Sequence, residues 1–248
     1  MEEVMAAYEP WNKLAQNIAY GSWALALLIV LGHLVKLMTT GDPKAKYDYI
    51  NRYEIRNLWF ATIVLVIGCC FYANSYIIEL NTILVIVRVF TTVSMGLIAA
   101  LIVQNLLKFY YPFYIEKRLK ELRYRPRISP KSGKPMQLLS EEEEDAYLDE
   151  GMQAEENVFS VDYDVWKDEA TGFIKIEKYA GHLHALECPE CNYQTFKVTK
   201  EEILKTPTPM EEGELMKHYQ CSYCGYKAKK TVTLRSAASS KFEESATA

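Results

Sequence analysis

The amino-terminal half of the chain contains three apolar runs that are each long enough to cross a lipid bilayer as a helix. Residues 58–78 carry no charge, residues 83–107 carry only Arg88, and residues 18–38 form the third run. A helix needs about 20 mostly apolar residues to cross the hydrocarbon core of a bilayer. The pattern therefore predicts a membrane domain of three transmembrane helices over residues 18–107.

The first run is less apolar than the other two, because His33 and Lys36 lie near its end. Its centre, residues 23–34, is almost wholly apolar, and a lysine near a helix end can extend its ammonium group to the interface. A buried or interfacial helix is the alternative. A cleaved signal peptide is disfavoured, because acidic residues, among them Glu9, precede the run where positive charge is expected.

The distribution of Lys and Arg predicts the orientation, because these residues concentrate in short cytoplasmic loops. Four of them follow the first run: Lys44, Lys46, Arg52 and Arg56. Seven follow the third run, in residues 108–127, whereas residues 79–82 contain none. We therefore expect residues 1–17 to lie outside and the carboxy-terminal half to lie in the cytoplasm, with the protein integral to the cytoplasmic (inner) membrane.

Charge also separates the two halves of the chain. Residues 1–127 contain 14 Lys and Arg against 9 Asp and Glu, and residues 128–248 contain 14 against 23. The basic segment 108–127 is expected to be a juxtamembrane helix, interrupted near Pro112, that meets anionic lipid headgroups; an acidic protein segment is the alternative partner. An acidic soluble half argues against nucleic acid, whose affinity depends largely on cations that neutralise phosphates.

The soluble half begins with a helix signal and continues with strand signals. Ser140 and Glu143 fit a capping box, which predicts an acidic helix ending near residues 157–160. Four segments have the composition or alternation of strands: residues 161–166, 173–179, 195–198 and 227–234. The tail, residues 236–248, is small and polar, and we expect it to be disordered.

Four of the six cysteines form two Cys-x-x-Cys pairs at the spacing of metal ligands. These four predicted ligands are Cys188, Cys191, Cys221 and Cys224. Each pair places two sulfurs on one side of a tight turn, and two such turns complete a tetrahedron of thiolates around Zn²⁺. Free thiols or a redox pair are the alternatives, but a thioredoxin-like pair would need a βαβ context that is not seen here.

A site with four thiolates leaves Zn²⁺ no open position, so the predicted zinc is structural rather than catalytic. His182 and His184 precede the first pair, and His218 precedes the second. They could be spare ligands, but surface residues or partners of the ligands are favoured. The predicted fold class is therefore a three-helix membrane domain followed by a small α+β or β zinc-ribbon domain, with the ribbon itself over residues 181–235.

Residues 123–235 resemble the carboxy-terminal zinc-ribbon region of TPM-domain membrane proteins. The resemblance rests on the segment Leu139–Leu148 (LSEEEEDAYL), the segment Ser160–Trp166 (SVDYDVW) and the two cysteine pairs that follow. It covers somewhat under half of the chain. The TPM domain itself is absent, and three apolar runs stand in its place, so no activity of that domain is carried over.

The resemblance implies a second zinc site that has lost its ligands here. In that family, further Cys-x-x-Cys pairs flank the acidic helix. The corresponding positions in this chain are Ser129, Ser132, Asp168 and Thr171. Hydroxyl groups are poor Zn²⁺ ligands beside thiolates. We therefore expect residues 128–180 to form a metal-free half-ribbon.

These features favour a non-catalytic membrane subunit or scaffold, whose zinc ribbon contacts cytoplasmic proteins and whose spans pack in an oligomer or complex. No catalytic constellation is seen. A transporter or channel component is the first alternative, because Arg88 is an intramembrane charge; the competing interpretation is that Arg88 pairs with Glu79. Nucleic-acid binding by the ribbon is the second alternative.

Overall fold

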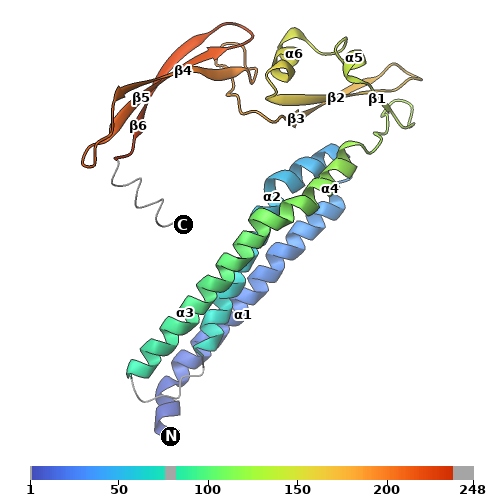
Figure 1. Cartoon of the computed structure of the whole chain (residues 1–248). Coiled ribbons are helices and arrows are strands. Elements are labelled where there is room, and N and C mark those ends of the chain that lie inside the picture. The colour runs from blue at the N-terminus through green and yellow to red at the C-terminus, as the bar shows by residue number, and fades with distance from the viewer. Residues whose placement is uncertain (1, 76–81, 237–248) are drawn as a thin grey trace. The chain divides into compact units, whose positions relative to one another are not determined.

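The computed structural model describes residues 2–75 and 82–236, and the chain forms two compact units (Figure 1). The first unit is residues 1–125 and contains the long helices. The second unit is residues 126–248 and contains the strands. The predicted tail, residues 236–248, and the predicted ion-pair partner Glu79 lie outside the described residues, except for Ser236.

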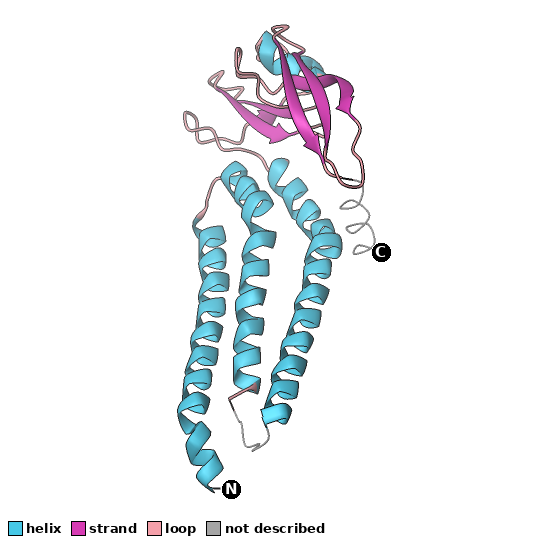
Figure 2. Ribbon diagram, turned by 90° about the vertical axis from the view of Figure 1, so that its left-hand side faces the viewer, coloured by secondary structure: helices cyan, strands magenta, loops and turns pink. Residues whose placement is uncertain are grey.

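The first unit consists of helices that run side by side (Figure 2). Their bounds are α1 (Glu2–Thr39), α2 (Pro43–Ala73), α3 (Thr82–Asn105), the π-helical segment η1 (Leu106–Tyr110) and α4 (Tyr111–Arg123). Three helical stretches are long and apolar enough to cross a membrane: Tyr8–Thr39, Pro43–Ala73 and Ile83–Arg123. The helices predicted from the three apolar runs are therefore present.

The ends of α2 differ from those of the predicted span because local capping, rather than hydropathy, sets them. The Asp42 side chain accepts a 3.0 Å hydrogen bond from the backbone N–H of Ala45, and Pro43 occupies the first turn, so α2 already starts in the predicted loop. At its other end α2 stops at Ala73, where Asn74 caps it, before the predicted end at residue 78.

The regular α-helix is interrupted close to Pro112, as predicted. The chain stays helical from α3 through η1 into α4, and Pro112, which has no N–H to donate to the preceding turn, directly follows the irregular segment. The break in the regular α-helix falls earlier, at residues 106–110, as a π-helical turn.

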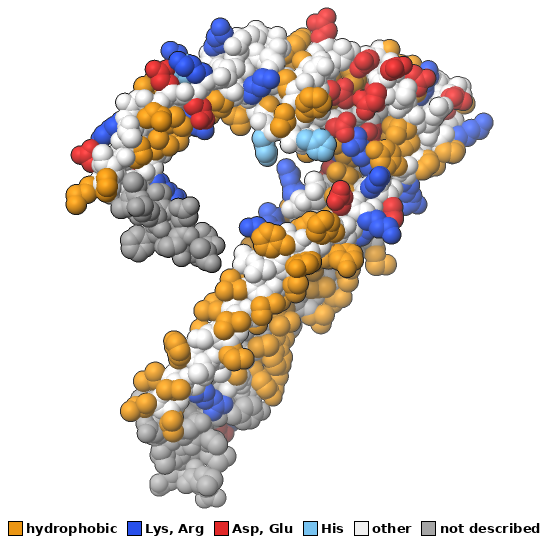
Figure 3. All heavy atoms as spheres, viewed as in Figure 1, with side chains coloured by type: hydrophobic (Ala, Val, Ile, Leu, Met, Phe, Trp, Pro, Cys, Tyr) orange, Lys and Arg blue, Asp and Glu red, His pale blue; other side chains and the backbone are white. Residues whose placement is uncertain are grey.

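Small residues allow α1 and α2 to approach closely. Ala15 and Ala19 are fully buried, and a Cβ on Gly68 would lie 2.7 Å from the ring of Trp23. Most described side chains of α3, by contrast, are exposed: Phe90 and Met95 are each 70% exposed. Figure 3 shows hydrophobic side chains over most of the visible face of these helices. Such an extended apolar surface is typical of contact with lipid or with partner helices.

The second unit contains two antiparallel sheets of three strands. The first has the order β1 (Gln137–Leu138), β2 (Val161–Lys167) and β3 (Ile174–Ala180). The second has the order β4 (Phe196–Lys205), β5 (Gly213–Cys221) and β6 (Lys227–Leu234). The four predicted strand segments all contain strand, but β5 and the short β1 were missed, and β4 runs further than predicted.

The acidic segment is not one helix, as predicted, but two short ones, α5 (Glu141–Glu144) and α6 (Glu150–Asn157). The predicted capping interaction is present, since Glu143 accepts a 3.1 Å hydrogen bond from the backbone N–H of Ser140. The helix breaks because Leu148 is buried in the core with Val161, Tyr163 and Val165. Asp149 then caps a new helix by accepting from the N–H of Met152 at 2.7 Å.

Candidate metal centre and buried polar clusters

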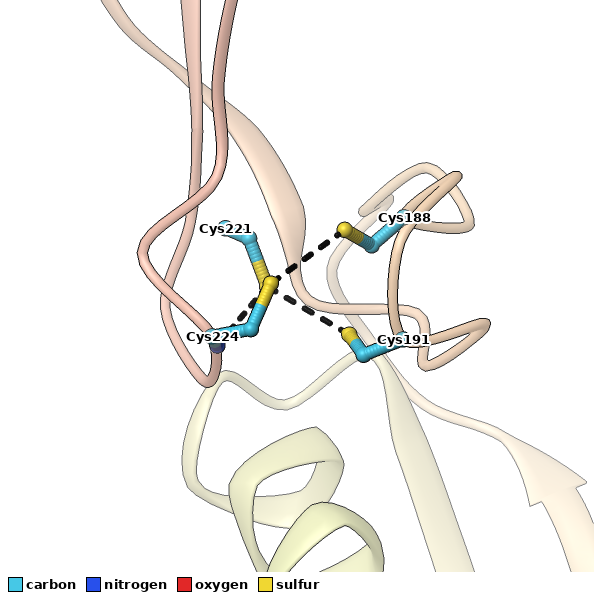
Figure 4. A group of neighbouring side chains, drawn as sticks. All are labelled: Cys188, Cys191, Cys221 and Cys224. Atoms are coloured by element: carbon cyan, nitrogen blue, oxygen red, sulfur yellow. Dashed lines mark hydrogen bonds between the residues drawn. The ribbon is translucent and has the colours of Figure 1, made fainter.

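The four predicted cysteine ligands converge in one cluster (Figure 4). Cys188 and Cys191 lie in the loop before β4, Cys221 is the last residue of β5, and Cys224 lies in the turn that leads to β6. Their four Sγ atoms all lie within 4.8 Å of one another, with 3.6 Å from Cys188 to Cys224 and 3.7 Å from Cys191 to Cys221. All four thiols are free, so this cluster could hold one metal ion.

Each pair of cysteines lies in a turn that is closed by backbone hydrogen bonding and contains one left-handed residue. The N–H of Cys188 donates to the carbonyl of Tyr193 at 2.9 Å, and the N–H of Asn192 donates back to Cys188 at 2.8 Å. The N–H of Cys221 likewise donates to Tyr226 at 2.8 Å. Asn192 and Gly225 have φ of 61° and 76°, which Gly and Asn adopt most readily.

Hydrogen bonds favour the charged form of one ligand. Burial opposes ionisation of Cys221, but the hydroxyl of Thr195 at 3.0 Å and the N–H of Cys224 at 3.3 Å lower its pKa to about 6. Both contacts stabilise the thiolate form of Cys221, which is the form that binds a metal ion. Thr195 is fully buried and directly precedes β4. Sequence reasoning placed it in a strand and missed its contact with Cys221, because that contact joins segments 26 residues apart.

The three histidines considered as spare ligands are not in the cluster. Within the described part of the chain, the metal-competent group contains the four cysteines alone. His182 and His184 are exposed, and His218 lies on β5, where its Nε2 is 3.5 Å from a carboxylate oxygen of Glu202.

A second pair of turns has the same backbone pattern without cysteines. The N–H of Ser129 donates to the carbonyl of Lys134 and the N–H of Gly133 donates back to Ser129, both at 2.9 Å. Asp168 and Gly172 repeat the arrangement at 2.8 Å in the β2–β3 connection. Gly133 and Gly172 both have φ of 68°, as the left-handed residues of the cysteine turns do. Ser129 and Asp168 therefore occupy, in these two turns, the positions that Cys188 and Cys221 occupy in the cysteine turns.

The four predicted residues of these turns meet around one carboxylate. Ser129 Oγ donates to Asp168 Oδ2 at 2.6 Å, and Thr171 Oγ1 donates to the same oxygen at 2.5 Å. Hydrogen bonds from Ser129, Thr171 and Ser132 hold the pKa of Asp168 far below its ordinary value. Ser129 and Asp168 are almost fully buried. A network of hydrogen bonds therefore links the two turns.

A buried polar cluster in the helical unit was not predicted. Glu54 of α2 is 2% exposed, and its Oε1 accepts hydrogen bonds of 2.7 Å from both Tyr111 Oη and Arg118 of α4. Its Oε2 lies 3.5 Å from Nε2 of His33 on α1, whose Nδ1 is 3.2 Å from Tyr49 Oη. Buried charge must be paired to be tolerated, so this cluster ties α1, α2 and α4 together.

Arg88 lies near the start of α3 and has a structural contact. Its guanidinium donates a 2.7 Å hydrogen bond to the carbonyl of Ala73, the last residue of α2. A cation at the carboxyl end of a helix compensates its unpaired carbonyls and its dipole. The predicted partner Glu79 is outside the described residues, so that pairing stays a prediction.

Comparison with known proteins yields no relative for this chain. No protein-family model matches it, and neither a curated protein nor a solved structure is significantly similar to it. The resemblance of residues 123–235 to the zinc-ribbon region of TPM-domain proteins therefore stays a prediction.

Proposed function

We propose that this protein is a non-catalytic integral membrane subunit or scaffold, whose cytoplasmic domain is stabilised by one structural zinc ion on four cysteines. The observation that carries the proposal is the convergence of Cys188, Cys191, Cys221 and Cys224, with all sulfurs within 4.8 Å of one another. Four protein ligands complete a tetrahedral shell, so the metal would hold loops together and leave no position for a substrate.

The sulfur geometry fits zinc better than it fits disulfides. A Zn–S distance of about 2.3 Å in a tetrahedron requires sulfurs about 3.8 Å apart, and a disulfide requires about 2.05 Å. The sulfurs of Cys188 and Cys224 are 3.6 Å apart, and those of Cys191 and Cys221 are 3.7 Å apart. Soft thiolate ligands in tetrahedral geometry select Zn²⁺ or iron–sulfur iron among common ions.

The distribution of Lys and Arg supports the same assignment. Lys44, Lys46, Arg52 and Arg56 lie on or near the first half of α2, at the end of the helical unit where α4 also ends. Lysine and arginine on this end favour placing it, and the soluble unit that follows α4, in the cytoplasm. A reducing cytoplasm keeps thiols available for metal.

The binding role follows from the two surfaces that the chain presents. The outward-facing apolar side chains of α3 suit lipid or partner helices, and the zinc ribbon would present a rigid surface to a cytoplasmic protein. Affinity purification in mild detergent tests this role directly. A stable, stoichiometric partner is expected for the parent chain and for a Cys69→Ser, Cys70→Ser control, and its loss is expected in Cys188→Ser, Cys191→Ser. A chain that purifies alone as a monomer would contradict the proposal.

A transporter or channel component is the second candidate, and the buried cluster around Glu54 is the observation that favours it. Ionisable residues among membrane helices often mark ion or proton pathways. Arg88, the charge that first suggested transport, instead contacts the end of α2. Flux into proteoliposomes that is lost in Glu54→Gln but retained in Arg88→Gln would favour this candidate over the scaffold.

A further inference from the structure

A cavity of about 290 Å³ lies between the first turns of α2 and the second half of α4. Six residues line it: Lys46, Ile50, Arg118, Glu121, Leu122 and Arg125. Three of them are cationic and one is anionic, so the lining has a net positive charge. All six belong to the helical unit, whereas the four cysteines belong to the second unit.

Arg118 is positioned by the buried polar cluster rather than by the cavity. Its Nη1 donates to Glu54 Oε1 at 2.7 Å, and the Glu54 side chain is 3% exposed, whereas the Arg118 side chain is 43% exposed. Tyr111 binds the same oxygen and further restricts the carboxylate. A guanidinium has five N–H donors in a rigid plane, so an arginine held on one edge can present its other edge at little cost in entropy.

Exposed aromatic side chains place the cavity close to the membrane surface. Phe109, Tyr110, Phe113 and Tyr114 are all at least 58% exposed and lie just before the cavity along the chain. Aromatic residues gather at the boundary between hydrocarbon and headgroups. Arg118 follows Tyr114 by one turn, or about 6 Å at 1.5 Å per residue, which is the depth of the headgroup layer.

We propose that this cavity binds a phosphate monoester, and that its source is the headgroup of an anionic lipid. Three cations around one cavity can surround a phosphate, and arginine matches phosphate oxygens with paired N–H donors. The carboxylate of Glu121 repels a phosphate, so it should weaken the binding. The inference goes beyond the proposed scaffold function, because it assigns a ligand to the helical unit.

The test uses the purified full chain in a neutral detergent and measures thermal stability against ligand concentration. The probes are dioctanoyl phosphatidic acid, glycerol 3-phosphate, which has the same phosphate without acyl chains, and dioctanoyl phosphatidylcholine. The test variant is Lys46→Ala, Arg125→Ala. The matched control is Lys117→Ala, Lys120→Ala, which removes the same charge from exposed positions of α4 outside the cavity.

Phosphatidic acid should stabilise the parent chain saturably, with glycerol 3-phosphate at least roughly tenfold weaker, and phosphatidylcholine should have no effect. The test variant should bind phosphatidic acid about tenfold more weakly or worse, since two charge-assisted contacts are lost, and the control should bind normally. Glu121→Gln should bind more tightly. Equal binding of glycerol 3-phosphate would overturn the lipid source. Equal weakening in the control, or no saturable effect of either phosphate probe, would overturn the site.

Discussion

Ser129 and Asp168 are joined by a 2.6 Å hydrogen bond, and they occupy the first positions of two turns that match the turns beginning at Cys188 and Cys221. In the cysteine turns the first positions present thiols that could share a metal ion. In the other two turns they present a hydroxyl and a carboxylate that contact directly. In the half of the second unit that contains β1–β3, a hydrogen bond therefore links the two turns. In the half that contains β4–β6, we assign this link to zinc.

Removing the hydroxyl of Ser129 should weaken that half selectively. Ser129→Ala leaves the buried Asp168 without one donor and the N–H groups of Lys131 and Ser132 without an acceptor, so we expect a local loss of about 1–2 kcal/mol. Hydrogen exchange measured by mass spectrometry should show faster exchange over residues 127–139 and 161–175. Thr231→Ala, on the exposed face of β6, is the control and should leave this region unchanged.

Metal removal should have the complementary effect. A strong chelator should abolish protection from hydrogen exchange over residues 186–226, because thiolates without metal repel one another and leave the turns unlinked. Protection in β2 and β3 should largely persist, since the Ser129–Asp168 network contains no metal ligand in our account. Collapse of protection in both sheets at the same chelator concentration would contradict this independence.

Arg127 belongs to the core of the soluble unit, although its sequence context predicted contact with lipid headgroups. It is 2% exposed, pairs with Glu177 at 2.7 Å and lies 4.7 Å from the ring centroid of Trp166. Burial alone would raise the pKa of Glu177, but hydrogen bonds from Arg127 and its neighbours hold it at about 2.

Breaking this pair should strongly destabilise the soluble unit. Arg127→Met leaves a buried carboxylate without its main partner, and the expected loss is about 3 kcal/mol. Urea unfolding followed by circular dichroism measures it. Lys134→Met, at an exposed position of the neighbouring turn, should change stability by less than about 0.5 kcal/mol.

Glu144 should make the soluble unit less stable as the pH rises. Its burial raises its pKa to about 7 from an ordinary value of 4.5, an effect that nearby carboxylates reinforce. The neutral acid is favoured in the folded state, so the stabilisation present below about pH 4.5 is lost as the pH rises through 7. Glu144→Gln should therefore be more stable than the parent chain at pH 8, by on the order of 1–2 kcal/mol.

The difference in unfolding free energy between Glu144→Gln and the parent chain should shrink at pH 5, where the folded parent holds Glu144 in its neutral form. Thermal unfolding of the two chains at pH 5 and pH 8 gives the comparison. A stabilisation of equal size at both values would mean that packing of the amide, rather than removal of a charge, is the cause.

Features that depend on short spacings could be predicted from the sequence. The two Cys-x-x-Cys pairs and the apolar runs each carry their signal within a few turns of chain, and the cysteine cluster confirms the grouping of the predicted ligands. The identity of the metal and the orientation in the membrane stay predictions. Capping by Asp42 and Asp149 depends on single side chains, which is why the helix boundaries were misplaced.

Features that depend on distant contacts could not be predicted. Glu54 lies in a segment that was interpreted as a polar cytoplasmic loop, and its partners Tyr111 and Arg118 are far along the chain. No sequence periodicity links Glu54 to residues 57 and 64 positions further along the chain. The cluster forms only because α2 packs against α4. The strand β5 was missed because its mixture of charged and apolar residues around His218 gives a weak alternation.

The zinc content of the purified full-length chain tests the central claim most directly. Metal analysis against protein mass should give one zinc per chain for the parent and for Cys69→Ser, Cys70→Ser, and none for Cys188→Ser, Cys221→Ser. A parent chain that contains no zinc, and whose four sulfurs resist thiol reagents because they are joined as disulfides, would contradict the account.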